Sequence, residues 1–184
     1  MAICIFPGTF NPIHNAHIKM AEFALENYGF EKIIFIPAYL PPHKEIESNL
    51  ANHRLQMVKL ATDYNPKFEV SDIEYKRSEP SYSLITVRKI IEQYKIQGRL
   101  NFIMGTDAFS KLDTWYKAEE LKPLVHFIVF PRRGDEVSET RGWDYEITTM
   151  DYEDVSSTEI RSGAKNIDKK VEEYIKEYGL YSNC

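Results

Sequence analysis

Two apolar patterns alternate along the 184 residues of this chain, and this alternation limits its possible folds more than its composition does. Short runs rich in β-branched and aromatic residues alternate with longer segments in which apolar residues recur at helical spacing. The short runs are Ile3–Phe6, Lys32–Ile36, Phe68–Val70, Asn101–Met104 and Phe127–Phe130. Strands without polar alternation, each followed by an amphipathic helix, are typical of a parallel sheet covered on both faces. The sequence therefore predicts an α/β fold with an open, doubly wound, mostly parallel sheet and helices on both faces.

Three helices are predicted by stripes of apolar residues between these runs. The first carries Ile18, Ala21, Leu25 and Tyr28 on one stripe, and Gly29 follows where a C-terminal cap belongs. The other two stripes are Leu55, Val58 and Thr62, and then Leu84, Val87, Ile91 and Tyr94, the last closing before Gly98. In a sheet of this kind ligands bind beyond the carboxyl ends of the strands, so the loops after the strands are where chemistry is expected.

The size and charge of the chain bound its class. With 43% hydrophobic residues, the 184 residues suffice for one sizeable core, and we expect a single domain over residues 1–184. The 23 basic and 28 acidic residues give a net charge of -5, which argues against nucleic-acid binding. Any anion site must therefore be local.

The two cysteines and the N-terminus indicate where the protein works. Cys4 lies in an apolar run and Cys184 is the last residue, which fits a reducing cytoplasm rather than a disulfide scaffold. The N-terminus has no basic leader, and no segment approaches the roughly 18 uninterrupted apolar residues of a membrane span. We expect a cytoplasmic protein without a membrane partner.

The loop after the first predicted strand is the strongest candidate for chemistry. Residues 6–17 read FPGTFNPIHNAH and run from that strand into the first helix, where backbone N–H groups and the helix dipole attract phosphate. Gly8 permits a close backbone approach. The segment matches neither a P-loop nor the three-glycine dinucleotide motif, so other groups must hold the phosphate.

His14 and His17 are the candidates for that role. Pro12 fixes a turn before them, and imidazoles three residues apart at a helix start can face one anion. A metal half-site and a purely structural role are the alternatives, although no clear set of cysteine or carboxylate ligands lies nearby in the sequence. From the residues alone these three interpretations stay open.

Several motifs in order along the chain carry a family resemblance. GTFNPIHNAH resembles the (H/T)xGH signature of the nucleotidyltransferase superfamily, and VSSTEIR resembles its companion ISSTxIR motif. The pieces between them that match are PPHK at 41–44, SYSLIT at 81–86, GTDAF at 105–109 and TWY at 114–116, followed by the closing VEEYIKEYGLY. The chain is similar over nearly its whole length to the nicotinate mononucleotide adenylyltransferase family, which implies a Rossmann-like fold.

The resemblance implies transfer of the adenylyl group of ATP to nicotinate mononucleotide, with release of pyrophosphate. It assigns the ATP site to Gly8, Thr9, Phe10, His14, His17, Gly105, Asp107, Ser156, Ser157, Thr158 and Arg161. Of these, His14, His17 and Arg161, together with Lys44, are the expected catalytic donors to phosphate. Mg²⁺ is expected to travel with ATP, and no metal ligand is assigned to the protein.

Some of these residues also have ordinary structural interpretations. The run Ser156–Thr158 reads as a helix cap, and Asp107 could face a ribose hydroxyl or a hydrated magnesium ion, or could cap a helix. For the acceptor, the resemblance implies that Lys44 contacts phosphate and that Trp115 and Tyr116 stack on the pyridine ring, with core packing as the alternative. Recognition of the nicotinate carboxylate falls to Thr86 and neighbouring backbone N–H groups.

Four positions depart from the family pattern: Pro7 and Ala16 replace glycines, Asn11 replaces an aspartate, and Ile85 replaces a common acidic residue. Pro7 removes one backbone donor beside the expected phosphate site, and Ala16 adds a methyl group. These departures motivate a rival hypothesis of an inactive nucleotide-binding module. A further rival is an adenylyltransferase of the same fold with nicotinamide mononucleotide or phosphopantetheine as its acceptor.

Overall fold

The computed structural model describes residues 2–41, 50–77, 80–135, 137, 142–150 and 166–181. Its strands are β1 (Ile3–Gly8), β2 (Lys32–Pro37), β3 (Phe68–Val70), β4 (Leu100–Gly105), β5 (Val125–Phe130) and β6 (Tyr145–Ile147). Its α-helices are α1 (Asn15–Tyr28), α2 (Ala51–Thr62), α3 (Ser83–Tyr94), α4 (Thr106–Phe109), α5 (Ala118–Leu121) and α7 (Lys169–Tyr178). Short 3₁₀ turns are η2 (Ile73–Lys76), η3 (Leu112–Thr114) and η4 (Lys122–Leu124).

The strands form one parallel sheet in the order β3-β2-β1-β4-β5-β6. The chain runs outward from β1 to β3, and then returns to the other side of β1 with β4. The order therefore reverses between β1 and β4, as in a doubly wound sheet. The predicted fold class is confirmed, and β6 is a strand that the sequence patterns did not predict.

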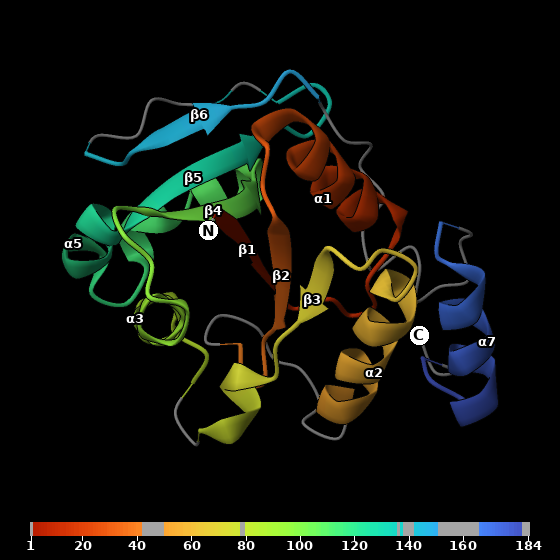
Figure 1. Cartoon of the computed structure of the whole chain (residues 1–184). Coiled ribbons are helices and arrows are strands. Elements are labelled where there is room, and N and C mark those ends of the chain that lie inside the picture. Colours follow the sequence, from red (N-terminus) through yellow and green to blue (C-terminus); the bar gives the residue numbers. More distant parts are fainter. Residues whose placement is uncertain are drawn as a thin grey trace.

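Helices cover both faces of the sheet (Figure 1). Helices α1, α2 and α7 lie on one side, and α3 and α5 lie on the other. Alternate side chains of each strand point to opposite faces, so Cys4 and Phe6 join the core under α1 and α2, whereas Ile3 and Ile5 join the core under α3. Strands buried on both faces need apolar residues at every position, which explains their lack of polar alternation.

The first helix ends as its sequence predicts. Gly29 adopts φ 67°, the left-handed conformation of a C-terminal cap, which costs glycine little. Met20, Ala21 and Ala24 are its buried residues, and Ile18, Leu25 and Tyr28 of the predicted stripe are partly buried against the same core. The third helix ends at Tyr94 with Lys95 in the left-handed conformation, ahead of Gly98.

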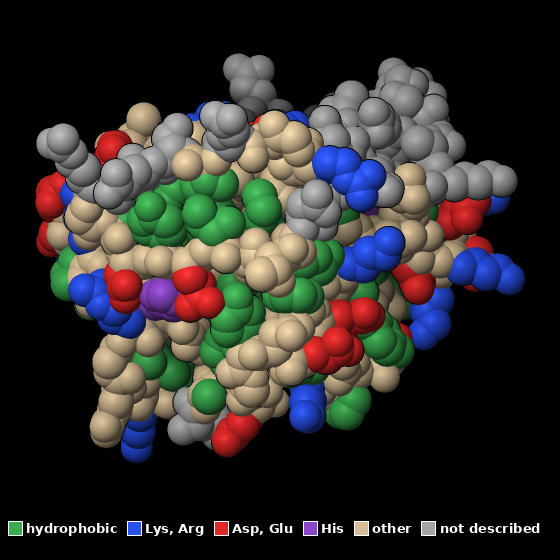
Figure 2. Space-filling view, turned by 90° about the horizontal axis from the view of Figure 1, so that it is seen from above, with side chains coloured by type: hydrophobic (Ala, Val, Ile, Leu, Met, Phe, Trp, Pro, Cys, Tyr) green, Lys and Arg blue, Asp and Glu red, His purple; other side chains and the backbone are tan. Residues whose placement is uncertain are grey.

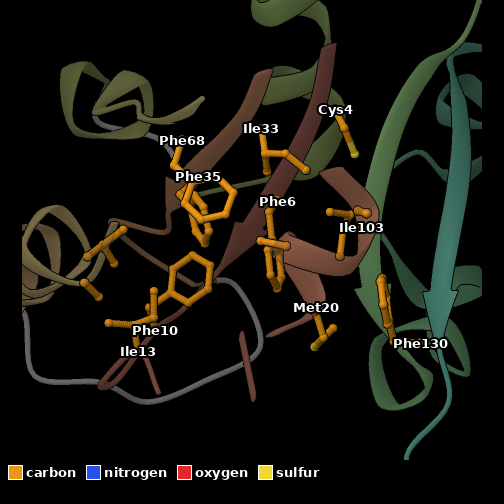
Figure 3. Close-up of a cluster of buried hydrophobic side chains, with 14 of the residues drawn as sticks. Cys4, Phe6, Phe10, Ile13, Met20, Ile33, Phe35, Phe68, Ile103 and Phe130 are labelled. Carbon is orange, nitrogen blue, oxygen red and sulfur yellow. The ribbon is translucent and has the colours of Figure 1, made fainter. Parts of the chain in front are cut away.

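The core beneath α1 extends to the carboxyl end of the sheet (Figure 3). The rings of Phe6, Phe10 and Phe35 point toward one another, and ring centroids lie 5.4 Å apart for Phe6 with Phe10 and 6.0 Å apart for Phe10 with Phe35. Phe10 belongs to the loop after β1, so this loop is anchored in the core by its own aromatic side chain.

The face of the molecule seen in Figure 2 is mixed in charge. On the face seen in Figure 2, Lys and Arg side chains are interspersed with Asp and Glu side chains. Among the described residues, no helix is both long enough and apolar enough to cross a membrane.

Candidate active site

The reversal of strand order brings two loops together at the carboxyl edge of the sheet. Strands β1 and β4 are neighbours, with Cys4 opposite Asn101. Strand β1 ends at Gly8 and continues toward α1, and β4 ends at Gly105 and leads directly into α4. Crevices at such a reversal are where open α/β sheets bind ligands.

Gly8 is required by the path of the loop that follows it. A Cβ atom at position 8 would lie 2.8 Å from Cζ of Phe10, closer than packed atoms normally come. Phe10 has φ 49° and is 3% exposed, because the chain folds back and inserts this ring into the core. Phe10 can therefore offer a ligand only its backbone, and Thr9 between them uses its carbonyl oxygen to accept a hydrogen bond from Arg54 at 2.8 Å.

His14 and His17 lie against each other at the start of α1. Their rings stack with centroids 3.8 Å apart at an interplanar angle of 27°, and the backbone N–H of His14 donates to Nδ1 of His17 at 3.1 Å. This bond is one half of a capping box, in which the third helical residue accepts from the N-cap backbone. Since Nδ1 accepts, we assign the proton of neutral His17 to Nε2, which makes Nε2–H a donor.

Aromatic rings hold the imidazole of His17 in place. The ring of Phe10 meets it edge-on at 5.0 Å and 88°, and the ring of Phe6 lies 6.0 Å away. A ring packed in this way loses little further freedom when a ligand binds, so its donor is preorganised.

His14 is neutral in the free protein. It is 7% exposed, and burial lowers its pKa to about 4. Its Nδ1 is buried and has no hydrogen-bond partner among the described residues. An anion beside the ring would favour the protonated form, and would therefore oppose the effect of burial on this pKa.

The first turn of α1 keeps one backbone donor available. The N–H of Asn15 donates to the carbonyl of Asn166 at 2.8 Å, and the N–H of His17 donates to the carbonyl of His14 at 3.1 Å. The N–H of Ala16 has no partner among the described residues. Ala16 is one of the four departures, and its methyl group leaves this donor in place.

The end of β4 places Asp107 beside Arg132, which follows β5. Nη2 of Arg132 donates to Oδ1 of Asp107 at 2.6 Å. Thr106 adds a second link, because its hydroxyl donates to Asp135 at 2.9 Å and accepts from the backbone N–H of Arg132 at 3.2 Å. Asp107 lies in the first turn of α4, whose N-cap is Gly105. A ribose hydroxyl that bonds to Asp107 must share this carboxylate with Arg132.

Thr86 is buried within a charged network. It is 1% exposed, its hydroxyl donates to Oε2 of Glu74 at 2.6 Å, and Nη2 of Arg77 donates to that hydroxyl at 2.9 Å. Its backbone N–H donates to the carbonyl of Tyr82 at 3.2 Å. Both hydrogen-bond donors of Thr86 are therefore used. The N–H groups without a partner inside the helix are those of residues 83–85, which form the first turn of α3.

The two aromatic residues of the TWY segment have different environments. Trp115 packs toward the core, with its ring 6.1 Å from Phe102 and 6.4 Å from Phe127. Tyr116 is 40% exposed and stacks on Tyr82 at 4.2 Å and 17°. Tyr82 is the N-cap of α3, so this stacked pair borders the helix start that contains residues 83–85.

Five of the expected site residues lie outside the described residues. They are Lys44, Ser156, Ser157, Thr158 and Arg161. Of the described departures, Asn11 accepts a hydrogen bond from the Tyr181 hydroxyl at 2.6 Å, and Pro7 lies within β1 opposite Ile36. Ile85 lies in the first turn of α3.

Sequence patterns did not single out Arg54, Glu74, Arg77 and Tyr82, which border these loops. For Arg54 a signal existed, because Ala51, Arg54, Leu55 and Val58 share one helical face. An arginine at a core position of an amphipathic stripe is unusual and indicates a buried partner.

Known proteins of one class resemble this chain over most of its length. The cytidylyltransferase-like family model matches residues 5–163, which include the loop after β1 and both expected phosphate motifs. A probable nicotinate-nucleotide adenylyltransferase of Caldicellulosiruptor bescii is 39% identical, over 98% of this chain and 99% of the relative. The nicotinate-nucleotide adenylyltransferase of Bacillus subtilis is 38% identical, over 98% of each chain. The chain therefore belongs to the nicotinate-nucleotide adenylyltransferase family, as the sequence motifs predicted.

Solved structures agree with this fold. The nicotinic acid mononucleotide adenylyltransferase of Plasmodium falciparum, complexed with APC, superimposes with a TM-score of 0.76 at 20% identity. The match covers 98% of this chain and 97% of that one. A putative nicotinate-nucleotide adenylyltransferase of Vibrio parahaemolyticus gives a TM-score of 0.67 at 22% identity, over 100% of this chain and 98% of the other.

Proposed function

We propose that this protein transfers the adenylyl group of ATP to nicotinate mononucleotide, which yields nicotinate adenine dinucleotide and pyrophosphate in NAD biosynthesis. Relatives of that name match almost the whole chain at 36–39% identity. The observation that carries the chemical part is the stacked pair of His14 and His17 at the reversal of the sheet, with centroids 3.8 Å apart.

The reaction needs orientation and charge stabilisation more than covalent help. A phosphate oxygen of the acceptor attacks the α-phosphorus of ATP in line, a new P–O bond forms, and the bond to the β-phosphate oxygen breaks with its electron pair leaving on pyrophosphate. We assign Nε2–H of His17 as a donor to the α-phosphate as charge builds there. The N–H of Ala16 and the imidazole of His14 are the further donors that we assign to the phosphates.

The remaining phosphate contacts are proposed from the sequence motifs. Lys44 and Arg161 supply positive charge, and the hydroxyls of Ser156, Ser157 and Thr158 bind the β- and γ-phosphates. Mg²⁺ enters as the Mg–ATP substrate, and it takes most of its ligands from phosphate oxygens and water. Two cysteines in 184 residues fit a cytoplasmic enzyme, which is where we place this reaction.

The acceptor is proposed to bind at the start of α3. The pyridine ring would pack against Tyr116 and Trp115, with its carboxylate facing the N–H groups of residues 83–85. Thr86 would act through the network that fixes this turn, because its hydroxyl is already bonded to Glu74 and Arg77. An amide in place of the carboxylate removes an ionised acceptor, so these N–H groups would bind it less well.

The test is pyrophosphate release from Mg–ATP with nicotinate mononucleotide, nicotinamide mononucleotide or phosphopantetheine offered separately. The proposal expects the highest kcat/KM with nicotinate mononucleotide. Faster turnover of the amide would show that the acceptor site is assigned wrongly. ATP binding without turnover of any acceptor would favour an inactive nucleotide-binding module.

A further inference from the structure

Arg54 on α2 joins the two loops that border the proposed active site. It is 0% exposed, Nη1 donates to the carbonyl of Thr9 at 2.8 Å and to that of Ala38 at 2.6 Å, and Nη2 donates to that of Tyr39 at 3.3 Å. Its three acceptors belong to two separate loops, and none of them belongs to α2. One guanidinium group therefore fixes the distance between these loops.

The two loops lead to different parts of the proposed chemistry. Thr9 opens the loop after β1, here called the nucleotide loop (residues 9–14), which ends at His14. Ala38 and Tyr39 open the loop after β2, here called the second loop (residues 38–41), which leads toward Lys44. The strands beneath them are paired as far as Gly8 and Pro37, and the N–H of Ala38 donates to the carbonyl of Gly8 at 2.9 Å. Beyond that bond, the hydrogen bonds of Arg54 connect the nucleotide loop to the second loop.

The second loop is also hydrogen-bonded to Ser81, which precedes the helix where the acceptor is proposed to bind. The hydroxyl oxygen of Ser81 accepts hydrogen bonds from the backbone N–H of Tyr39 at 3.1 Å and of Leu40 at 3.0 Å. The N–H of Ser81 donates back to the carbonyl of Leu40 at 2.8 Å. Ser81 stands just before α3, so the second loop connects Arg54 to the start of the helix where the acceptor is proposed to bind.

Stability alone does not account for an arginine at this position. Removing a guanidinium from water is costly, and burial lowers the pKa of Arg54. Among the described residues no carboxylate forms a salt bridge with Arg54, because the buried carboxylate of Glu74 pairs with Arg77 at 4.0 Å, and the Nε of Arg54 has no hydrogen-bond partner there. Apolar side chains in place of buried ionic groups are often neutral or stabilising. The arginine instead fixes the relative position of the two loops, because its planar guanidinium group donates to several carbonyl groups at once.

We propose that Arg54 is a positioning residue for adenylyl transfer. It holds the nucleotide loop and the second loop at the relative position that brings the ATP α-phosphorus and the acceptor phosphate together. This inference rests on the proposed function. Arg54 touches no substrate in this role and acts through the carbonyls of Thr9, Ala38 and Tyr39. Small errors in the placement of reacting groups cost rate steeply, so its loss should lower kcat more than the affinity for ATP.

The test compares Arg54→Met, Arg54→Lys and Val58→Ala in the full chain. Val58 is a fully buried apolar residue of the same helix, and its truncation lowers stability while leaving every hydrogen bond of Arg54 in place. Steady-state kcat and KM for both substrates are measured below the unfolding temperature of each variant, with ATP affinity measured separately by calorimetry. We expect kcat to fall about tenfold or more in Arg54→Met, and less in Arg54→Lys, which keeps the charge and some of the donors.

Val58→Ala is expected to keep the kcat of the unmodified protein once it is folded. The proposal is overturned if folded Arg54→Met keeps kcat within about twofold, or if Val58→Ala loses as much activity at a similar loss of stability. Should Arg54→Met fail to fold, an unchanged kcat in Arg54→Lys would overturn it equally. If the unmodified protein binds ATP but transfers to no acceptor, the proposed function fails first, and that outcome is visible before any variant is made.

Discussion

The imidazoles of His14 and His17 stack with centroids 3.8 Å apart, and the backbone N–H of His14 donates to Nδ1 of His17. This bond leaves the Nε2–H of His17 as its proton donor, on a ring fixed by Phe10 and Phe6. The two histidines differ in burial, so their substitutions should have different consequences.

Replacing His17 by alanine should reduce kcat about 100-fold or more, because removing one preorganised donor to developing charge costs roughly 2.7–4 kcal/mol of barrier. The measurement is pyrophosphate release at saturating ATP and acceptor. His126→Ala is the matched control, since His126 lies on β5 and pairs with Asp144, just before β6, and with Glu146 on β6. Full turnover by His17→Ala would remove the proposed mechanism.

His14 should make stability depend on pH in a defined window. Its pKa is lowered from 6.5 to about 4, so between these values the unfolded chain binds a proton that the folded protein does not. Stability is therefore complete above pH 6.5 and is lost progressively as the pH falls toward 4. The contribution is on the order of 3 kcal/mol, from about 1.4 kcal/mol per pKa unit.

His14→Asn keeps a good N-cap residue and removes the titrating group. Urea unfolding at several pH values should show a shallower loss of stability in this variant than in the unmodified protein. Identical pH slopes for the two proteins would contradict the assignment.

Gly8→Ala should distort the nucleotide loop, because the new Cβ would lie 2.8 Å from Cζ of the buried Phe10 ring. We expect a loss of about 1–3 kcal/mol of unfolding free energy, typical of an overpacked core, together with a lower kcat. Adding Phe10→Leu to Gly8→Ala should recover part of the activity. If the single variant matches the unmodified protein in both stability and kcat, the contact does not constrain the loop.

Thr86→Val should destabilise the protein by about 1–3 kcal/mol, since Glu74 and Arg77 would lose a buried hydroxyl partner. The KM for nicotinate mononucleotide should rise at the same time, because the network supports the first turn of α3. Thr86→Ser retains the hydroxyl and should retain most of both properties. Thermal unfolding and acceptor kinetics measure the two effects, and equal behaviour of the valine and serine variants would show that the hydroxyl is unimportant.

Tyr116→Ala should raise the KM for the acceptor about threefold to tenfold and leave the KM for ATP unchanged, because aromatic stacking is worth about 0.5–1.5 kcal/mol. Tyr64→Ala serves as the control, since Tyr64 is exposed and bonds Glu22 instead. An equal rise in both KM values would place Tyr116 outside the acceptor site.

The elements that the sequence predicts are those whose burial leaves a regular pattern of apolar residues. Buried parallel strands are apolar at every position and helices are apolar along one stripe, so β1, β2, β4 and β5 are visible in the sequence. Strand β3 is as short as β6 and is predicted from its run Phe68–Val70, whereas β6 is not visible because the last two residues of Tyr145–Ile147 are exposed. It becomes a strand because the edge of β5 is there to pair with it.

Local sequence patterns establish the alternation of strands and helices, the loop that follows β1, and the family to which these motifs belong. Three relationships are seen in the folded chain and not in these patterns: Thr86 is bonded to Glu74 and Arg77, Asp107 pairs with Arg132, and Arg54 spans two loops. The difference arises from the distance along the chain over which each kind of interaction acts. Periodicity and turn preferences act between neighbours in the chain, whereas the partner of a buried polar group is set by which distant segments the fold brings within hydrogen-bonding distance.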